Sequence, residues 1–186
     1  MVQFPKRDRW FPAQGIPQGV LLLTHGLNLH PERMDDLAQA FSASGLEVFR
    51  PAFYGHHAEN GDFLKVDPEH WEEDAKRFHA LVNARAQELK VPLFLGAYSF
   101  SALIFQVLRE ELPFARRVLW APALKLHFWY PIAALVLGAF PDFTFSSRVP
   151  GGYSANAKSG LRAFRSLHHF RNEWKRMHEK PTECPP

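Results

Sequence analysis

The sequence predicts an α/β protein built on a doubly wound, mostly parallel sheet, followed by a helical lid segment. Two observations predict this fold class. Between residues 19 and 121, apolar segments of strand length alternate with longer segments of helical periodicity. Such alternation is typical of a parallel sheet with helices on both faces. In addition, two of the strand-like segments end in short turns rich in small and polar residues, at 24–28 and around Ser99.

The first elements follow from periodicity and from the residues that end them. Residues 2–11 are expected to form a short antiparallel edge hairpin, and residues 19–23 an apolar strand. A helix follows, with Gly45 standing where a helix C-cap belongs. Its apolar stripe recurs at i, i+3, i+4 and i+7, in Met34, Leu37, Ala38 and Phe41.

A second, longer helix is predicted to begin at Asp67 and Pro68, as N-cap and first helical residue. Acidic residues in its first turns suit the positive end of the helix dipole. Its buried stripe is expected to comprise Trp71, Ala75, Phe78 and Val82. Further on, Pro113 is expected to end the helix that follows Ser99, and residues 117–121 to form another strand.

The segment around Ser99 is the most informative part of the chain. An apolar strand at 91–97 leads to Ser99, and an apolar helix follows at 102–112, with small residues, Ala97 and Ser101, two positions away on either side. This pattern is typical of a nucleophile elbow, a tight strand-to-helix turn that exposes a serine hydroxyl. The alternative is a structural hydroxyl that only caps the helix.

A second feature supports the catalytic interpretation of Ser99. The strand at 19–23 ends in Thr24, His25, Gly26, Leu27 and Asn28. Acyl transfer through a serine needs two N–H donors, one just after the nucleophile and one from the loop after an earlier central strand. The backbone amides of Phe100 and Leu27 stand at those positions. His25 and Gly26 are expected to support this oxyanion loop, and His25 is not expected to act as a base.

With these residues in view, the chain resembles the α/β-hydrolase superfamily, and within it the serine aminopeptidase-like and monoacylglycerol-lipase-like branch. The resemblance covers most of residues 19–123 and rests on four segments: His25 to Asn28, Gly45 to Pro51, Tyr54 to His57 and the turn at Ser99. It implies a serine hydrolase with Ser99 as nucleophile, acting on a small-molecule substrate, a carboxylic ester or a related acyl compound. Peptidase activity is the nearest alternative within the family.

The resemblance has three departures. Ala97 and Ser101 replace the usual elbow glycines, and Ala52 stands where relatives usually carry an acid. The acid and the histidine of the triad should follow the serine on strands after the lid, yet neither is found at its expected position. Residues 180–182 look like the entry to the first such strand, but the chain then reads Glu-Cys-Pro-Pro, and prolines cannot continue a central strand.

The expectation is therefore a hydrolase truncated by a premature stop or a frameshift, with impaired catalysis. Two other interpretations stay open. The chain could be a functional variant that takes its base from His168, His169 or His178. It could also be a non-catalytic homologue that binds an acyl ligand or a protein partner.

The predicted organisation is a hydrolase core at 1–123, a lid at 124–180 and a tail at 181–186 that does not look native. Residues 128–140 form the most hydrophobic segment but fall well short of the ~20 that span a membrane. We interpret them as a buried or lid helix, which favours an acyl substrate and suggests weak contact with a membrane surface. If 117–121 is the last strand, its exposed edge favours dimerisation.

Composition fits one globular domain: of 186 residues, 46% are hydrophobic and 22% charged. The single cysteine, Cys184, excludes an intramolecular disulfide and, with no apolar leader, predicts a cytoplasmic protein. Basic residues gather at 162–180, where a solvated helix face is a better interpretation than nucleic-acid binding. Neither a cofactor nor a metal is predicted, because the paired histidines at 56–57 and 168–169 lack the spacing of ligand motifs.

Overall fold

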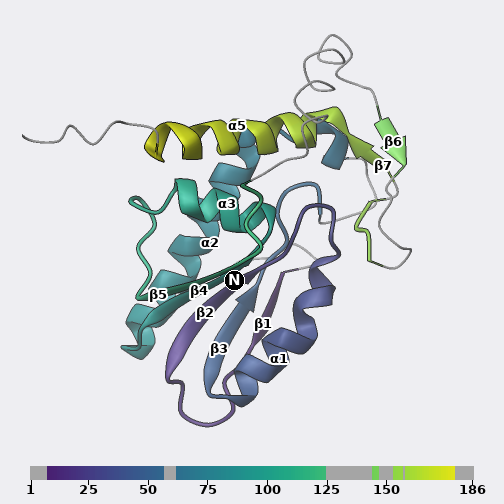
Figure 1. Cartoon of the computed structure of the whole chain (residues 1–186). Helices are drawn as coiled ribbons and strands as arrows, with labels where there is room; N and C mark the ends of the chain where they lie inside the picture. The colour runs from purple at the N-terminus through teal and green to yellow at the C-terminus, as the bar shows by residue number, and fades with distance from the viewer. Residues whose placement is uncertain (1–7, 57–61, 125–143, 147–152, 157, 179–186) are drawn as a thin grey trace, which may run out of the picture.

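The computed structural model describes residues 8–56, 62–124, 144–146, 153–156 and 158–178. A five-stranded sheet in the order β1-β3-β2-β4-β5 forms its centre (Figure 1). Three of its four strand pairings are parallel, and at one edge β1 runs antiparallel to β3. The strands are β1 (Arg9–Phe11), β2 (Gly19–Thr24), β3 (Leu46–Arg50), β4 (Leu93–Tyr98) and β5 (Arg116–Trp120).

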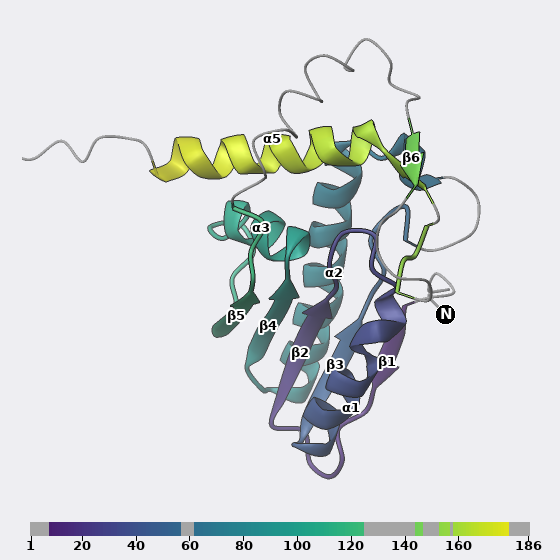
Figure 2. The same cartoon turned by 45° about the vertical axis from the view of Figure 1, so that its right-hand side comes forward.

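Helices cover both faces of the sheet, as predicted for a doubly wound fold (Figure 2). One face packs on α1 and the other on α2 and α3, and alternate residues of β2 enter the two cores: Val20 and Leu22 on one side, Leu21 and Leu23 on the other. The helical elements here are η1 (Pro31–Met34), α1 (Asp35–Ala43), η2 (Asp62–Lys65), α2 (Pro68–Leu89) and α3 (Phe100–Val107).

Helix boundaries agree with the sequence signals at two places and differ at a third. Gly45, with φ +91°, follows the last turn of α1, and α2 begins after Asp67 with Pro68 at its first position. The helix after Ser99 begins earlier than expected and ends at Val107, well before Pro113. The Arg117 guanidinium accounts for the early end, because it donates to the carbonyl oxygens of Phe105, Arg109 and Leu112.

Of the edge hairpin expected at residues 2–11, residues 2–7 lie outside the described residues. β1 forms the antiparallel edge of the sheet and pairs with β3, with Trp10 opposite Phe49. This pairing buries Phe11 in the α1-side core, alongside Val48.

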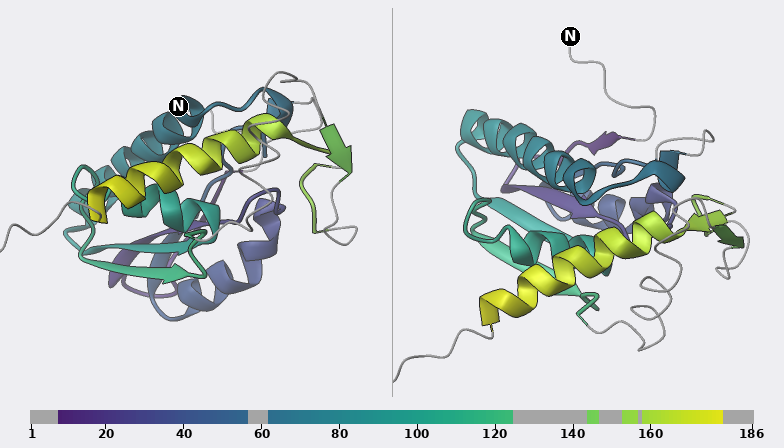
Figure 3. Two further views of the ribbon diagram at one scale, coloured as in Figure 1. Left: turned by 45° about the horizontal axis from the view of Figure 1, so that its top comes forward. Right: turned by 90° about the horizontal axis from the view of Figure 1, so that it is seen from above.

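The last described elements are β6 (Thr144–Ser146), β7 (Lys158–Gly160) and α5 (Leu161–His178). β6 and β7 pair antiparallel, a small sheet that the sequence analysis did not predict. α5 lies across α3 (Figure 3), with Leu167 and Phe170 buried and Trp174 packed at the margin. None of the described helices is long and apolar enough to cross a membrane. The segment at 128–140 and the tail at 181–186 lie outside the described residues.

Candidate active site

Ser99 occupies the turn between β4 and α3 in a conformation that a non-glycine residue rarely adopts. Its φ is +59° and its ψ is −113°, so the backbone is strained. Three hydrogen bonds hold it. Its N–H donates to the Trp120 carbonyl (2.9 Å), and its own carbonyl accepts from the N–H groups of Leu103 (3.2 Å) and Ala123 (3.1 Å). The neighbouring strand and helix thus fix the turn, while the serine stays partly exposed.

Ser101 contributes hydrogen bonds to this turn as well as a small side chain. Its fully buried hydroxyl donates to the Tyr98 carbonyl (3.0 Å) and accepts from the Thr24 hydroxyl (2.9 Å). The Tyr98 N–H lies 3.3 Å from the same oxygen. One side chain therefore joins the ends of β2 and β4 directly beneath the Ser99 turn. The sequence analysis treated Ser101 only as a small replacement for glycine.

The loop after β2 lies against the Ser99 turn. A methyl group on Gly26 would stand 2.8 Å from the Tyr98 ring and 3.5 Å from Ser99 Cβ. Any side chain at position 26 would therefore displace the loop or the ring. Glycine at this position therefore allows the loop to lie this close to the Ser99 turn.

Two backbone N–H groups near Ser99 are not used by the fold. In the loop, the Asn28 N–H donates to His56 Nε2 (2.9 Å) and the Leu29 N–H to the Gly26 carbonyl (3.1 Å). Among the described residues, the N–H of Leu27 has no acceptor. Phe100 is the first residue of α3, where N–H groups have no intrahelical acceptor. These are the two amides that the sequence analysis selected.

His25 and His56 are both fully buried and serve the backbone. His25 Nε2 accepts from the Phe53 N–H (3.2 Å), so its proton sits on Nδ1, which donates to the Gly26 carbonyl (2.9 Å). His56 Nε2 accepts from Asn28, and its Nδ1 lies 3.3 Å from the Tyr54 carbonyl. With both nitrogens of each ring used in this way, neither histidine is placed to take a proton from Ser99.

A segment far along the chain fastens the same loop. Asn28 has φ +51°, and its Oδ1 accepts from the Asn156 N–H (2.8 Å) while its Nδ2 donates to the Asn156 carbonyl (3.0 Å). Asn156 also donates to the Gly55 carbonyl (2.9 Å). We call residues 153–156 the strap. One weak signal for this contact can be found in the sequence: an asparagine, which tolerates positive φ, stands directly after the predicted oxyanion residue.

The three histidines of α5 make other contacts. His168 Nδ1 lies 3.2 Å from Asn172 Nδ2, and His178 Nδ1 lies 2.7 Å from the Trp174 carbonyl, while His169 lines a cavity beside Asp67. Within the described ranges, no histidine or carboxylate is hydrogen-bonded to the Ser99 hydroxyl. In the same part of the chain, no three metal-binding side chains come together.

Comparisons with known proteins identify the family and the fold of the chain. The family model described as serine aminopeptidase, S33, matches residues 15–181. A monoglyceride lipase homolog of Monkeypox virus is 28% identical over 100 residues, covering 51% of this chain and 34% of that protein. Protein K6 of Vaccinia virus (strain Western Reserve) is 33% identical over 58 residues, covering 31% of this chain and 70% of that protein. The chain thus spans about a third of the lipase homolog.

Solved structures share the fold. A soluble variant of monoglyceride lipase from Saccharomyces cerevisiae, bound to a substrate analog, superposes with a TM-score of 0.79 at 16% identity, covering 94% of this chain and 66% of that one. A structure of the metagenome-derived lipolytic enzymes LipS and LipT superposes with a TM-score of 0.71 at 17% identity, covering 94% of this chain and 72% of that one. At these identities the likeness concerns the fold, which is that of an α/β-hydrolase.

Proposed function

Since this chain belongs to the serine aminopeptidase S33 family, we propose that it is a serine hydrolase of the lipase or esterase type, with Ser99 as nucleophile. The observation that carries the proposal is the arrangement at the turn. A strained, hydrogen-bonded backbone presents Ser99 directly beside Gly26, and the N–H groups of Leu27 and Phe100 are left without acceptors among the described residues.

In the proposed reaction, Ser99 Oγ attacks the carbonyl carbon of an ester and the carbonyl oxygen becomes negatively charged. The N–H groups of Leu27 and Phe100 receive that charge. Collapse expels the alcohol and leaves an acyl group on Ser99, which water then removes. The lipase names of the relatives favour an ester over a peptide substrate. Contact of residues 128–140 with a membrane surface stays a prediction from the sequence.

Full activity also needs an imidazole to accept the serine proton and a carboxylate to orient it. Because no described imidazole reaches Ser99, we expect the 186 residues alone to react slowly. In a serine protease, loss of the base costs about 10⁶ in turnover and leaves ~10³–10⁴ over water. Ester hydrolysis near background is the expected result, and it should rise when a segment carrying the acid and the histidine is supplied.

Covalent labelling tests the nucleophile directly. The 186-residue chain is incubated with a serine-directed fluorophosphonate, and the adduct is followed by intact mass and located by peptide mapping. We expect one adduct, on Ser99, that forms slowly and is lost in Ser99→Ala. Ser44→Ala, at an exposed serine on the far end of α1, is the matched control and should label like the wild type. Labelling that persists in Ser99→Ala would contradict the proposal.

The absence of an imidazole at Ser99 among the described residues also favours a second candidate, a non-catalytic homologue that binds an acyl ligand. On that reading, a non-hydrolysable acyl ligand would bind wild type and Ser99→Ala equally well, and neither protein would form an adduct. The labelling experiment and a binding titration on the same two proteins distinguish the candidates.

A further inference from the structure

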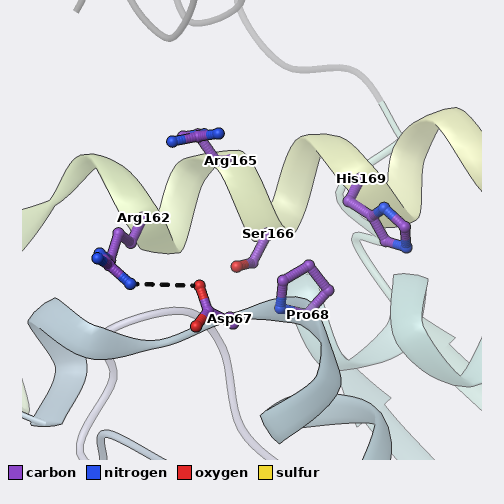
Figure 4. Close-up of a pocket in the computed structure, with 6 residues that line it drawn as sticks. All are labelled: Asp67, Pro68, Arg162, Arg165, Ser166 and His169. Atoms are coloured by element: carbon purple, nitrogen blue, oxygen red, sulfur yellow. Dashed lines mark ion pairs between the residues drawn. The ribbon is translucent and has the colours of Figure 1, made fainter. Parts of the chain in front are cut away.

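A cavity of about 320 Å³ separates the first turns of α5 from the start of α2 (Figure 4). Its polar groups come from these two elements and play no part in the chemistry proposed for Ser99. Among the described residues, its lining comprises Asp67, Pro68, Arg162, Arg165, Ser166 and His169.

The lining carries more positive than negative charge. Arg162, Arg165 and His169 recur at i, i+3 and i+7 along α5, a spacing that sets them on one side of the helix. The carboxylate among the lining residues, Asp67, is the N-cap of α2 and takes part in a capping box with His70. Arg162 Nη1 lies 3.6 Å from Asp67 Oδ1, beyond hydrogen-bond length. Two guanidinium groups thus retain donors that could serve a ligand.

Ser166 supplies the observation that points to a ligand. Its side chain is 1% exposed, and Figure 4 shows its hydroxyl directed toward Asp67 and Pro68, into the cavity. No hydrogen bond to this hydroxyl is found among the described residues. It is not one of the fully enclosed polar atoms that lack a partner there, so its oxygen is open to the cavity. The start of α2 adds the positive end of a helix dipole on the opposite wall.

We propose that this cavity binds the phosphate group of a small phosphate monoester. Guanidinium groups pair with phosphate through two parallel hydrogen bonds, and the serine hydroxyl can donate to a third oxygen. A phosphate monoester has three terminal oxygens and about two negative charges, against two oxygens and one charge for a carboxylate, so it can use more of the donors on these four side chains. The cavity exceeds the size of a phosphate, which leaves room for a small organic group. The ester could be soluble or the headgroup of a phosphatidic-acid lipid.

Thermal unfolding with inorganic phosphate tests the site, against sodium chloride at the same ionic strength. A ligand that binds only the folded state raises Tm with its concentration. We expect phosphate to raise the Tm of the wild type, to have no specific effect on the double variant Arg162→Gln/Arg165→Gln, and to have a reduced effect on Ser166→Ala. Arg176→Gln, on the last turns of the same helix and outside the cavity, is the matched control and should respond like the wild type.

Broadening of the phosphate ³¹P resonance by folded protein provides a second readout, and Ser166→Ala provides a milder variant if the double variant does not fold. The proposal is overturned if phosphate acts no differently from chloride on the wild type, or if the double variant and Ser166→Ala both respond fully. Two further ligands then show whether the bound phosphate monoester is a soluble molecule or a lipid headgroup. Competition by glycerol phosphate indicates a soluble ester, and co-sedimentation with phosphatidic-acid vesicles, lost in the double variant and kept in Arg176→Gln, indicates a lipid headgroup.

Discussion

At the scale of single residues, Ser101 shows how a hydroxyl can serve where the family pattern has glycine. A glycine would fit the close approach of strand and helix but would add no hydrogen bond. Here the hydroxyl accepts from Thr24 and donates to Tyr98, so it ties β2 to β4 at the point where the backbone strain of Ser99 must be held. The substitution therefore keeps the turn compact and adds a cross-strand connection.

Removing that hydroxyl should cost stability. Ser101→Ala leaves the buried Thr24 hydroxyl and the Tyr98 backbone groups without their partner, and such losses cost about 1–3 kcal/mol. Urea denaturation followed by circular dichroism should show a lower denaturation midpoint for Ser101→Ala than for the wild type. Ser44→Ala, which removes an exposed hydroxyl, should change the free energy of unfolding by less than ~0.5 kcal/mol. Equal midpoints for the two variants would show that the Ser101 network adds no stability.

Gly26 allows a sharper test of the loop position. In Gly26→Ala the new methyl group would stand 2.8 Å from the Tyr98 ring, and such overpacking costs about 1–3 kcal/mol. We expect lower stability and slower fluorophosphonate labelling of Ser99. Tyr98→Ala removes the ring that the methyl group meets, so the double variant should lose less stability than the sum of the single ones. Strict additivity would mean that the loop and the ring do not meet in solution.

At the scale of elements, the strap connects the loop after β2 to the segment before β7. Asn156→Ala removes the side-chain hydrogen bond to Gly55 and loosens the pairing with Asn28. Native-state hydrogen exchange should then quicken at residues 25–30 and stay unchanged in β4. Gln87→Ala, at an exposed amide on α2, should leave exchange at both places unaltered. If exchange at 25–30 does not respond, the strap does not hold the loop.

α5 should make stability depend on pH through His168. Burial first, and then the charges of Arg171 and Lys175, lower the pKa of this imidazole below its ordinary value. The unfolded chain therefore binds a proton more readily, so His168 adds stability above the unfolded pKa of about 6.5 and loses it as pH falls through the lower folded value. Denaturation midpoints between pH 7.5 and pH 5 should fall less in His168→Gln than in the wild type. Parallel profiles would contradict this.

The sequence was sufficient for the elements whose signals are local. Each of these signals lies within a few neighbouring residues: the apolar stripe of α2, its start at Asp67 and Pro68, and the glycine after α1. The sequence was insufficient where residues distant in the chain determine where an element ends or what it pairs with. α3 ends early where Arg117, from the next strand, donates to the Phe105 carbonyl of the helix and to the Arg109 carbonyl just beyond it, and β1 pairs with β3 because the core lies there. The three-residue strands β6 and β7 give too short a pattern to recognise.

The same distinction applies to the candidate site. Ser99, Leu27 and Phe100 could be selected because each motif lies in one short segment, and their catalytic roles stay predictions. The roles of His56 and Asn156 could not be predicted from the sequence, because each depends on a partner from another part of the chain. A hydrogen bond between residues that are distant in sequence leaves no periodicity to detect.

At the scale of the whole molecule, β5 is the edge of the sheet among the described strands and is partly apolar. Val118 is 51% exposed, and an open, almost wholly apolar cavity of about 350 Å³ lies nearby, lined by Leu29, Met34, Leu37, Tyr98 and Trp120. An exposed strand edge with apolar side chains favours pairing with another chain. We propose that the 186-residue chain self-associates through this edge.

Sedimentation velocity across a concentration series tests this. The wild type should shift toward larger species as concentration rises, and Val118→Lys, which sets a charge on the edge strand, should shift less. Lys65→Glu, an exposed charge change on η2, serves as a control for altered net charge and should behave like the wild type. A wild type that stays monomeric throughout, or a Val118→Lys variant that associates equally, would exclude the edge as the interface.

The strap also bears on the order in which the protein acquires its site during synthesis. Its hydrogen bonds to Asn28 join residues 128 positions apart, so they close one of the longest loops in the chain and must form after residue 156 has left the ribosome. The partners of the Ser99 turn, by contrast, are complete once Ala123 has emerged. At ~5–20 residues per second, the serine turn can be in place seconds before the oxyanion loop is fastened. A nascent chain can therefore carry an assembled serine turn, with the Phe100 amide in place, before the opposing Leu27 amide is fixed.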